Sequence, residues 1–161
     1  MWKPRLALYA LLGVMAFGLF PNLEAQDVIK GLVVGKDAIR VAVVLYADNP
    51  ETQFYLNSHD SKENILTAIQ GIQYPGGPEA NLGAALEEVT ESLLGPDAGG
   101  RAEEGVPQVL MVISAGQSSD DVSQGERALK QASVYTFGLA VGDLILPNWK
   151  LLLRTDRVCA V

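Results

Sequence analysis

The sequence predicts an α/β fold of the doubly wound class, in which helices cover both faces of a mostly parallel sheet. Three nearly continuous apolar runs support this prediction: Ile39–Ala47, Val109–Ile113 and Val134–Val141. Such runs are typical of strands that are covered on both faces, as in parallel sheets. Segments with helical spacing separate the runs, and strands that alternate with helices favour right-handed crossovers and a doubly wound sheet.

The chain opens with a segment, residues 1–25, that has the features of a secretory signal peptide. Lys3 and Arg5 precede the charge-free run Leu6–Phe20, and a sequence ending at Ala25 resembles a small-residue cleavage site. The run is shorter than the roughly 20 residues that a membrane-spanning helix needs. We therefore expect a cleaved leader and no stable membrane span. The alternative is that the leader stays and packs inside the fold.

The next elements are a helix end, two strands and a helix. Residues 26–34 are too short for an independent helix and are predicted to end one, and the buried strand Ile39–Ala47 follows a turn. Glu51–Leu56 alternates polar and apolar residues, which predicts an edge strand. Ser61 is expected to open a helix, because apolar residues then recur at helical spacing: Ile65, Leu66, Ile69 and Ile72.

The second half predicts two further helices. Leu82–Leu93 is amphipathic and is expected to form one helix that ends near Gly95, before a surface loop and the strand Val109–Ile113. Asp120 and Asp121 are expected to cap the next helix, because carboxylate oxygens accept hydrogen bonds from its free N–H groups. The aromatic residues of the strands are predicted to be core and sheet-face residues: Tyr46, Phe54, Tyr55, Tyr135 and Phe137.

Composition excludes several classes of function. Hydrophobic residues make up 48% of the chain, which indicates a globular protein, and the net charge of -7 argues against a nucleic-acid partner. Cys159 is the only cysteine, so the chain has no cysteine pair for an intrachain disulfide or metal site, and we expect a free thiol rather than an interchain link. His59 is expected to be a solvated turn residue, and the sequence contains no phosphate-loop or G-x-S-x-G motif. No cofactor is predicted, although a doubly wound fold permits a nucleotide binder.

Four segments in a fixed order carry a family resemblance. The segments are GKDAIRVAVVLYADNPETQFYLNSHDSKENILTAIQGI, GGPEANLGAALEEV, GVPQVLMVISAGQSSDDV and ALKQASVYTFGLAVG. They resemble the von Willebrand factor type A domain, whose fold is Rossmann-like, and in particular the copies in type VI collagen alpha-3-like chains. The resemblance implies a secreted, non-enzymatic adhesion domain of the extracellular matrix. Its partners would be matrix proteins or other von Willebrand factor A domains.

The resemblance also bears on a metal site. Family members that bind ligands through a metal use an Asp-x-Ser-x-Ser motif, a Thr and an Asp on three loops, whose oxygens suit Mg²⁺. Here the first motif is absent, Leu82 aligns with the Thr, and Ala115 aligns with the Asp. Neither side chain has an oxygen, so we predict no metal site. The alternative is a divalent-metal-dependent ligand-binding adhesion domain.

The resemblance is incomplete at both ends, which divides the chain into a leader (1–25), a partial domain (26–142) and a divergent tail (143–161). The family's first strand lies between the strands placed here at Val41 and Val109, and nothing after the leader matches it. A gap there would expose about five large apolar side chains, at a cost on the order of 10 kcal/mol. This leaves three alternatives. The leader stays and fills the gap, the domain is unstable, or the chain is a truncated or misassembled product.

Overall fold

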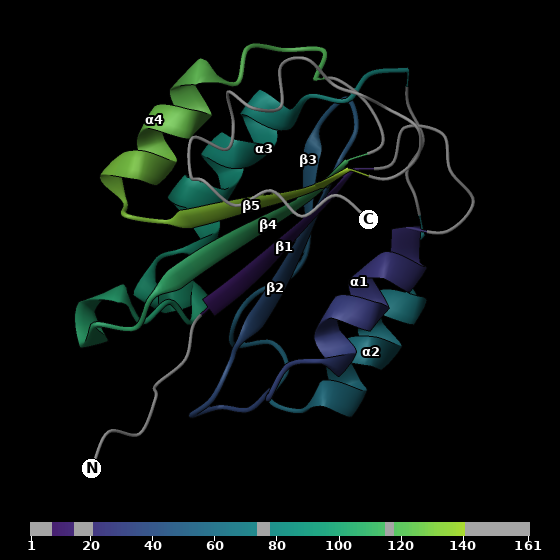
Figure 1. Cartoon of the computed structure of the whole chain (residues 1–161), viewed down its shortest axis with the longest axis vertical. Coiled ribbons are helices and arrows are strands. Elements are labelled where there is room, and N and C mark those ends of the chain that lie inside the picture. The colour runs from purple at the N-terminus through teal and green to yellow at the C-terminus, as the bar shows by residue number, and fades with distance from the viewer. Residues whose placement is uncertain (1–7, 15–20, 74–77, 115–117, 141–161) are drawn as a thin grey trace.

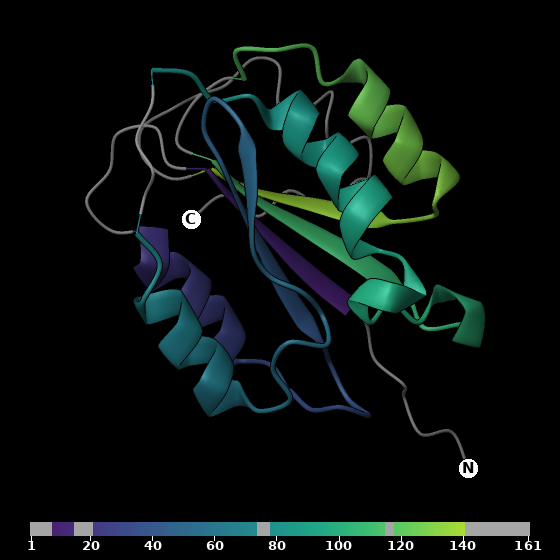
Figure 2. The ribbon, with the colours of Figure 1, turned by 180° about the vertical axis from the view of Figure 1, so that it is seen from behind.

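A computed structural model of the chain describes residues 8–14, 21–73, 78–114 and 118–140. These residues form a five-stranded sheet in the order β3-β2-β1-β4-β5. Neighbouring strands are parallel except for the pair β2 and β3. Helices α1 and α2 cover one face of the sheet, and α3 and α4 cover the other (Figures 1 and 2). The predicted doubly wound, mostly parallel α/β fold is confirmed.

The elements follow one another in the predicted alternation. The helices are α1 (Pro21–Lys30), α2 (Lys62–Gln70), α3 (Leu82–Glu88) and α4 (Ser123–Gln131), with the π-helical turn η1 (Val89–Leu93) and the 3-10 turns η2 (Pro96–Ala98) and η3 (Ala102–Glu104). The strands are β1 (Leu8–Val14), β2 (Val41–Tyr46), β3 (Pro50–Phe54), β4 (Gln108–Ser114) and β5 (Tyr135–Ala140). No helix within the described ranges is long and apolar enough to cross a membrane.

The central strand β1 comes from the predicted leader. It pairs in parallel with β2, with Tyr9 opposite Val41, and with β4, with Tyr9 opposite Val109. This is the position at which the sequence predicted a missing strand, so the structure places the leader in the gap. Figure 1 shows β1 between β2 and β4. Removal of the leader by a signal peptidase stays a prediction.

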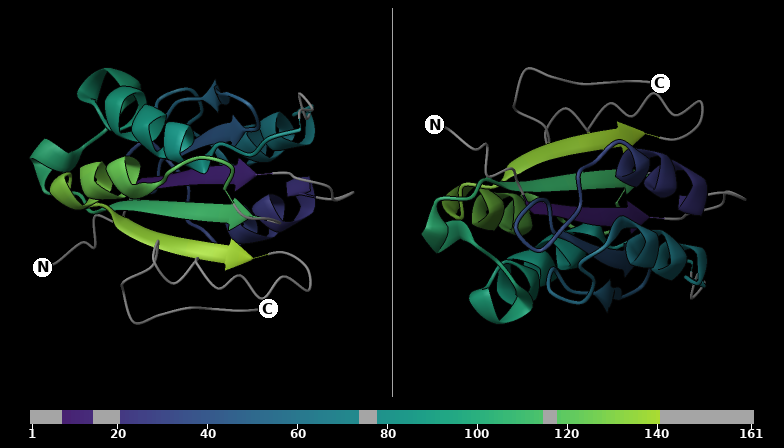
Figure 3. Two further views of the ribbon diagram at one scale, coloured as in Figure 1. Left: turned by 90° about the horizontal axis from the view of Figure 1, so that it is seen from above. Right: turned by 90° about the horizontal axis from the view of Figure 1, so that it is seen from below.

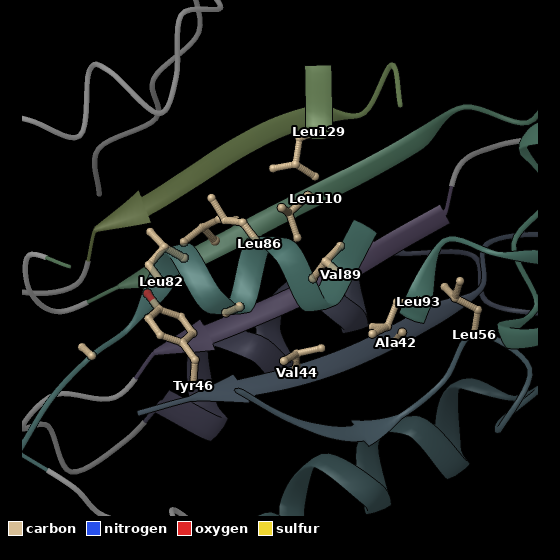
Figure 4. Packing of buried hydrophobic residues seen from close by; sticks show 13 residues of the cluster. Ala42, Val44, Tyr46, Leu56, Leu82, Leu86, Val89, Leu93, Leu110 and Leu129 are labelled. Carbon is tan, nitrogen blue, oxygen red and sulfur yellow. The ribbon is translucent and has the colours of Figure 1, made fainter. Parts of the chain in front are cut away.

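Two hydrophobic clusters lie on the two faces of the sheet. All six residues of β2 are buried, as expected for a strand covered on both faces, and five of them divide between the two clusters in alternation. Ala42, Val44 and Tyr46 join the cluster under α3 and α4 (Figure 4). Val41 and Val43 join the cluster under α1 and α2.

The helix predicted at Leu82–Leu93 changes character midway. It is α-helical to Glu88 and continues as the π-turn η1. The Thr90 hydroxyl donates hydrogen bonds to the carbonyls of Leu86 and Glu87, at 3.2 and 2.9 Å. Such side-chain bonds compete with the regular backbone ladder, which accounts for the wider turn.

The predicted placement of the aromatic residues in strands is confirmed for all but Tyr55, which directly follows β3. Tyr46 and Phe54 are buried, whereas Tyr55, Tyr135 and Phe137 are 41%, 59% and 37% exposed. The last two lie on β5, which is the outermost strand of the described sheet (Figure 3). An edge strand has a neighbour on one side only, so its aromatic side chains are less covered than those of β2.

Candidate functional site

Three loops meet at the edge of the sheet where β2 and β4 end. They are residues 47–49 after β2, residues 78–81 before α3 and residues 118–121 after β4. The N–H of Asn81 donates to the carbonyl of Ala47 at 2.9 Å, and its side-chain amide donates to the carbonyl of Asp48 at 2.8 Å. The Asp48 carboxylate accepts from the N–H of Glu79 at 3.0 Å. The first two loops are thus joined by the chain's own polar groups.

Two serines join the second loop to the third. Ser119 and Ala80 exchange two hydrogen bonds: the N–H of Ser119 donates to the Ala80 carbonyl at 2.9 Å, and the Ser119 hydroxyl accepts from the Ala80 N–H at 3.1 Å. The Ser118 hydroxyl accepts from the N–H of Leu82 at 3.1 Å. Sequence reasoning missed both serines. The signal that could have found them is the polar run QSSDD, which follows the predicted strand Val109–Ile113 after three intervening residues.

Asp120 also connects the second and third loops, and the prediction that it caps the following helix was wrong. Its carboxylate oxygens accept from the N–H groups of Gly83 and Ala84, at 2.7 and 2.8 Å, and from the Ser118 hydroxyl at 2.5 Å. It therefore caps the first turn of α3 rather than the following helix α4. The free N–H groups of a helix start attract a carboxylate by hydrogen bonding and by the helix dipole. Gly83 allows this approach, because a Cβ there would lie 2.3 Å from the Asp121 carbonyl oxygen.

Asp121 makes the capping contact that was predicted for α4. One carboxylate oxygen accepts from the Ser123 N–H at 3.0 Å and from the Ser123 hydroxyl at 2.6 Å. These two hydrogen bonds, with the nearby Arg127 charge, hold the pKa of the Asp121 carboxyl below its usual value. Asp121 and Ser123 have the Asp-x-Ser spacing of the family's metal motif, and their hydrogen bonds at the start of α4 account for it.

Leu82 lies at the position that the resemblance aligns with a metal-binding threonine. Its side chain is only 4% exposed and belongs to the cluster that contains Tyr46 and Leu110 (Figure 4). The side chain therefore points into the core, and only its backbone N–H faces the loop after β4. Ala115, the other aligned position, lies outside the described residues.

Other candidate groups lie apart from these loops. Among the described residues, no group of three or more His, Cys, Asp or Glu side chains could hold a metal ion. His59 is half-buried and packs edge-on against Phe54, with ring centroids 5.0 Å apart, so it is less solvated than predicted. Cys159 lies outside the described residues.

Residues 24–153 match the family described as von Willebrand factor type A domain. The chain belongs to this family. The von Willebrand factor A match begins after β1 and extends into the segment that the sequence predicts as a divergent tail. The domain boundaries predicted at residues 25 and 142 therefore stay predictions.

Several matrix proteins are similar to this von Willebrand factor A chain. The mouse collagen alpha-4(VI) chain is 37% identical over 113 residues, which are 70% of this chain and 5% of that protein. The mouse collagen alpha-1(XX) chain is 34% identical and matches 78% of this chain and 9% of its own length. Mouse vitrin is 34% identical and matches 71% of this chain and 17% of its own length. The chain thus spans a small part of these relatives, and the predicted resemblance to type VI collagen chains is confirmed.

Solved structures share the fold. Proximal thread matrix protein 1 from the mussel byssus superposes with a TM-score of 0.82 at 17% identity, over 92% of this chain and 41% of that one. The manganese-loaded TRAP protein of Plasmodium vivax superposes with a TM-score of 0.75 at 20% identity, over 92% of this chain and 62% of that one. At such identities these two structures support the fold alone.

Proposed function

We propose that this chain acts as a secreted extracellular-matrix module that makes protein–protein contacts, without catalysis and without a working metal-ion-dependent adhesion site. Its family membership and its similarity to collagens and vitrin support the matrix role. The partners would be matrix proteins or other von Willebrand factor A domains.

The orientation of Leu82 carries the metal-independent part of this proposal. A Mg²⁺ ion requires about six oxygens in octahedral array, of which the protein supplies several. At Leu82 the chain presents an apolar side chain that is buried among Tyr46 and Leu110. An oxygen ligand at this point would require both a different side chain and its removal from the core. Ala115 also offers no side-chain oxygen.

The alternative is a divalent-metal-dependent ligand-binding adhesion domain. It is favoured by the fold that this chain shares with a form of the mussel protein whose metal-binding motif is occupied by zinc (TM-score 0.76, 21% identity). That protein's metal is evidence for that protein, and it makes the alternative worth a direct test.

Two measurements on the full chain distinguish the proposals. Isothermal titration calorimetry with Mg²⁺ and with Zn²⁺ should give no saturable heat, whereas the mussel protein serves as a positive control for zinc. Binding to immobilised type VI collagen, measured by biolayer interferometry, should be unchanged by EDTA. Saturable Mg²⁺ binding, or binding to collagen that EDTA abolishes, would establish the alternative.

A matched pair of variants sharpens the calorimetric test. Leu82→Thr introduces a hydroxyl at the aligned position, and Leu86→Thr introduces the same group one helical turn later, in the same cluster. Neither variant should gain Mg²⁺ affinity, because the chain still lacks the first motif and the Asp at position 115. A gain in the Leu82→Thr variant alone would show that the remaining ligands are present, which contradicts the proposal.

A further inference from the structure

The outer strand β5 carries two aromatic rings on one face of the sheet. In the register of the parallel strands, Tyr135 and Phe137 lie opposite Val109 and Met111 of β4. Residues in register point to the same face of a sheet, and Met111 packs against the cluster under α1 and α2. The two rings therefore lie on the face that α1 and α2 cover over the central strands.

This face of the sheet is covered unevenly. Val41 and Val43 of β2 are buried on it, whereas Tyr135 and Phe137 are exposed. The opposite face is covered up to the start of β5, since Val134, directly before the strand, packs against the cluster under α3 and α4. Figure 3 shows β5 at the margin of the sheet. Adjacent exposed aromatic rings mark a surface at which a further apolar group can pack.

The sequence that directly follows β5 contains an apolar segment. The strand ends at Ala140, and two typical turn residues, Gly142 and Asp143, come next. Residues 144–153 then read LILPNWKLLL and are mostly apolar. An extended chain rises about 3.3 Å per residue, so this segment is long enough to turn back along the whole of β5, which has 6 residues.

The family match includes this segment. It extends over residues 24–153 and so ends at the last leucine of LILPNWKLLL. An apolar segment that belongs to the domain is stabilised by an apolar surface on which to pack. Among the described residues, the exposed apolar surface that lies closest to it along the chain is the one at Tyr135 and Phe137.

We infer that the segment Leu144–Leu153 packs on the face of β5 that carries Tyr135 and Phe137. The short connection favours the chain's own segment over a second copy or a matrix protein, because a segment on a short flexible linker has an effective concentration in the millimolar range. The inference does not depend on the proposed function. It means that the matrix contacts proposed above are made by other surfaces of the domain.

Limited proteolysis of the full chain tests this inference, because Lys150 provides a trypsin site within the segment. Cleavage after Lys150 should be at least about tenfold slower in the full chain than in a synthetic peptide of residues 141–161, since a packed segment is cut only when it opens. Equal rates in the chain and in the peptide would overturn the inference. Protection that rises with protein concentration would also overturn it, because the occupant of the face would then be a second copy.

Substitutions of the aromatic residues test where the segment packs. Phe137→Ala should speed cleavage after Lys150 at least about fivefold, because loss of the ring increases the population of the open form. The matched control is Tyr55→Ala, which removes another exposed ring, next to β3 at the opposite margin of the sheet. It should leave the rate unchanged. Equal effects of the two substitutions, or no effect of either, would show that the segment does not pack on β5.

A substitution within the segment separates its release from a general loosening of the fold. Cleavage after Lys130, in α4, reports on the described fold in the same digest. Leu146→Asp alters none of the described residues, so it should speed cleavage after Lys150 and leave cleavage after Lys130 unchanged, and it decides the question if Phe137→Ala speeds both. An unchanged rate after Lys150 in Leu146→Asp would overturn the inference. The calorimetric and collagen-binding tests do not depend on this result, so the two proposals fail independently.

Discussion

Deletion of β1 is the most severe test of this fold, because that strand lies at the centre of the sheet. Residues of both neighbouring strands are almost fully buried beside it: Val41, Val43 and Val44 of β2, and Leu110 and Val112 of β4 are 0–5% exposed. If the deletion exposed about half of each of these side chains, the loss would be about 4–8 kcal/mol, at roughly 1.5–3 kcal/mol per fully buried side chain. The whole free energy of unfolding of a typical domain is about 5–15 kcal/mol.

Urea denaturation followed by circular dichroism measures this loss. A chain that begins at residue 21 should either lack a cooperative transition or unfold about 2–4 M earlier in urea, for a slope of about 2 kcal/mol per molar. The control is a chain that begins at residue 8, which retains β1 and should unfold near the midpoint of the unaltered chain. If both deletions had the same midpoint as the full chain, β1 would not be part of the stable fold, and the reasoning would be refuted.

Two further predictions concern single residues. Gly125→Ala should lower the free energy of unfolding by about 1–2 kcal/mol, since a Cβ there would lie 2.4 Å from the Leu86 Cβ and force α3 and α4 apart. Gly95→Ala is the control, because a Cβ at Gly95 has open space, and it should change the free energy of unfolding by less than about 1 kcal/mol in the same urea titration. The lowered pKa of Asp121 means that its stabilising effect is present above its unfolded-state pKa, near 3.8, and is lost as the pH falls through the lower folded-state value. The difference in urea midpoint between the unaltered chain and Asp121→Ala should therefore shrink between pH 6 and pH 3, and a constant difference would contradict this cause.

The strands that the sequence predicted well are those with continuous apolar runs. β2 was predicted because a run such as that from Val41 to Tyr46 is stable only when both faces are covered, and all six residues are buried. The helix at Ser61 was predicted from its cap, and the Ser61 hydroxyl does accept from the N–H of Asn64 at 3.3 Å. Local chemistry determines both features, so a window of a few residues is enough to find them.

The strand β1 could not be predicted in the same way. An apolar run flanked by a positive start satisfies the requirements of a signal peptide and, equally, those of a buried central strand. Periodicity does not separate the two, because neither has a polar face. The empty position in the predicted sheet was the stronger indication, since a gap there exposes apolar side chains of the two neighbouring strands and leaves their backbone edges unpaired.

The candidate site shows the same division between local and distant contacts. The lack of a side-chain oxygen at Leu82 was evident from the residue itself. The structure adds that this side chain is buried in the core. The partner of Asp120 was not evident, because rules for helix caps consider the nearest helix only. The bonds to Gly83 and Ala84 span 37 and 36 residues, and only the folded sheet brings these groups together.

The two roles available to the leader exclude each other in one molecule. A protease that removes residues 1–25 also removes β1 and the first half of α1, which spans Pro21–Lys30. The processed chain would then have to join β2 directly to β4 or bind a replacement strand, since otherwise two edges in the middle of the sheet would lose their hydrogen bonds. Mass spectrometry of the N-terminus of secreted protein decides between the two roles. A folded, secreted chain that starts at Gln26 would show that the sheet closes without β1, whereas a retained leader would make β1 the reason that the domain is stable.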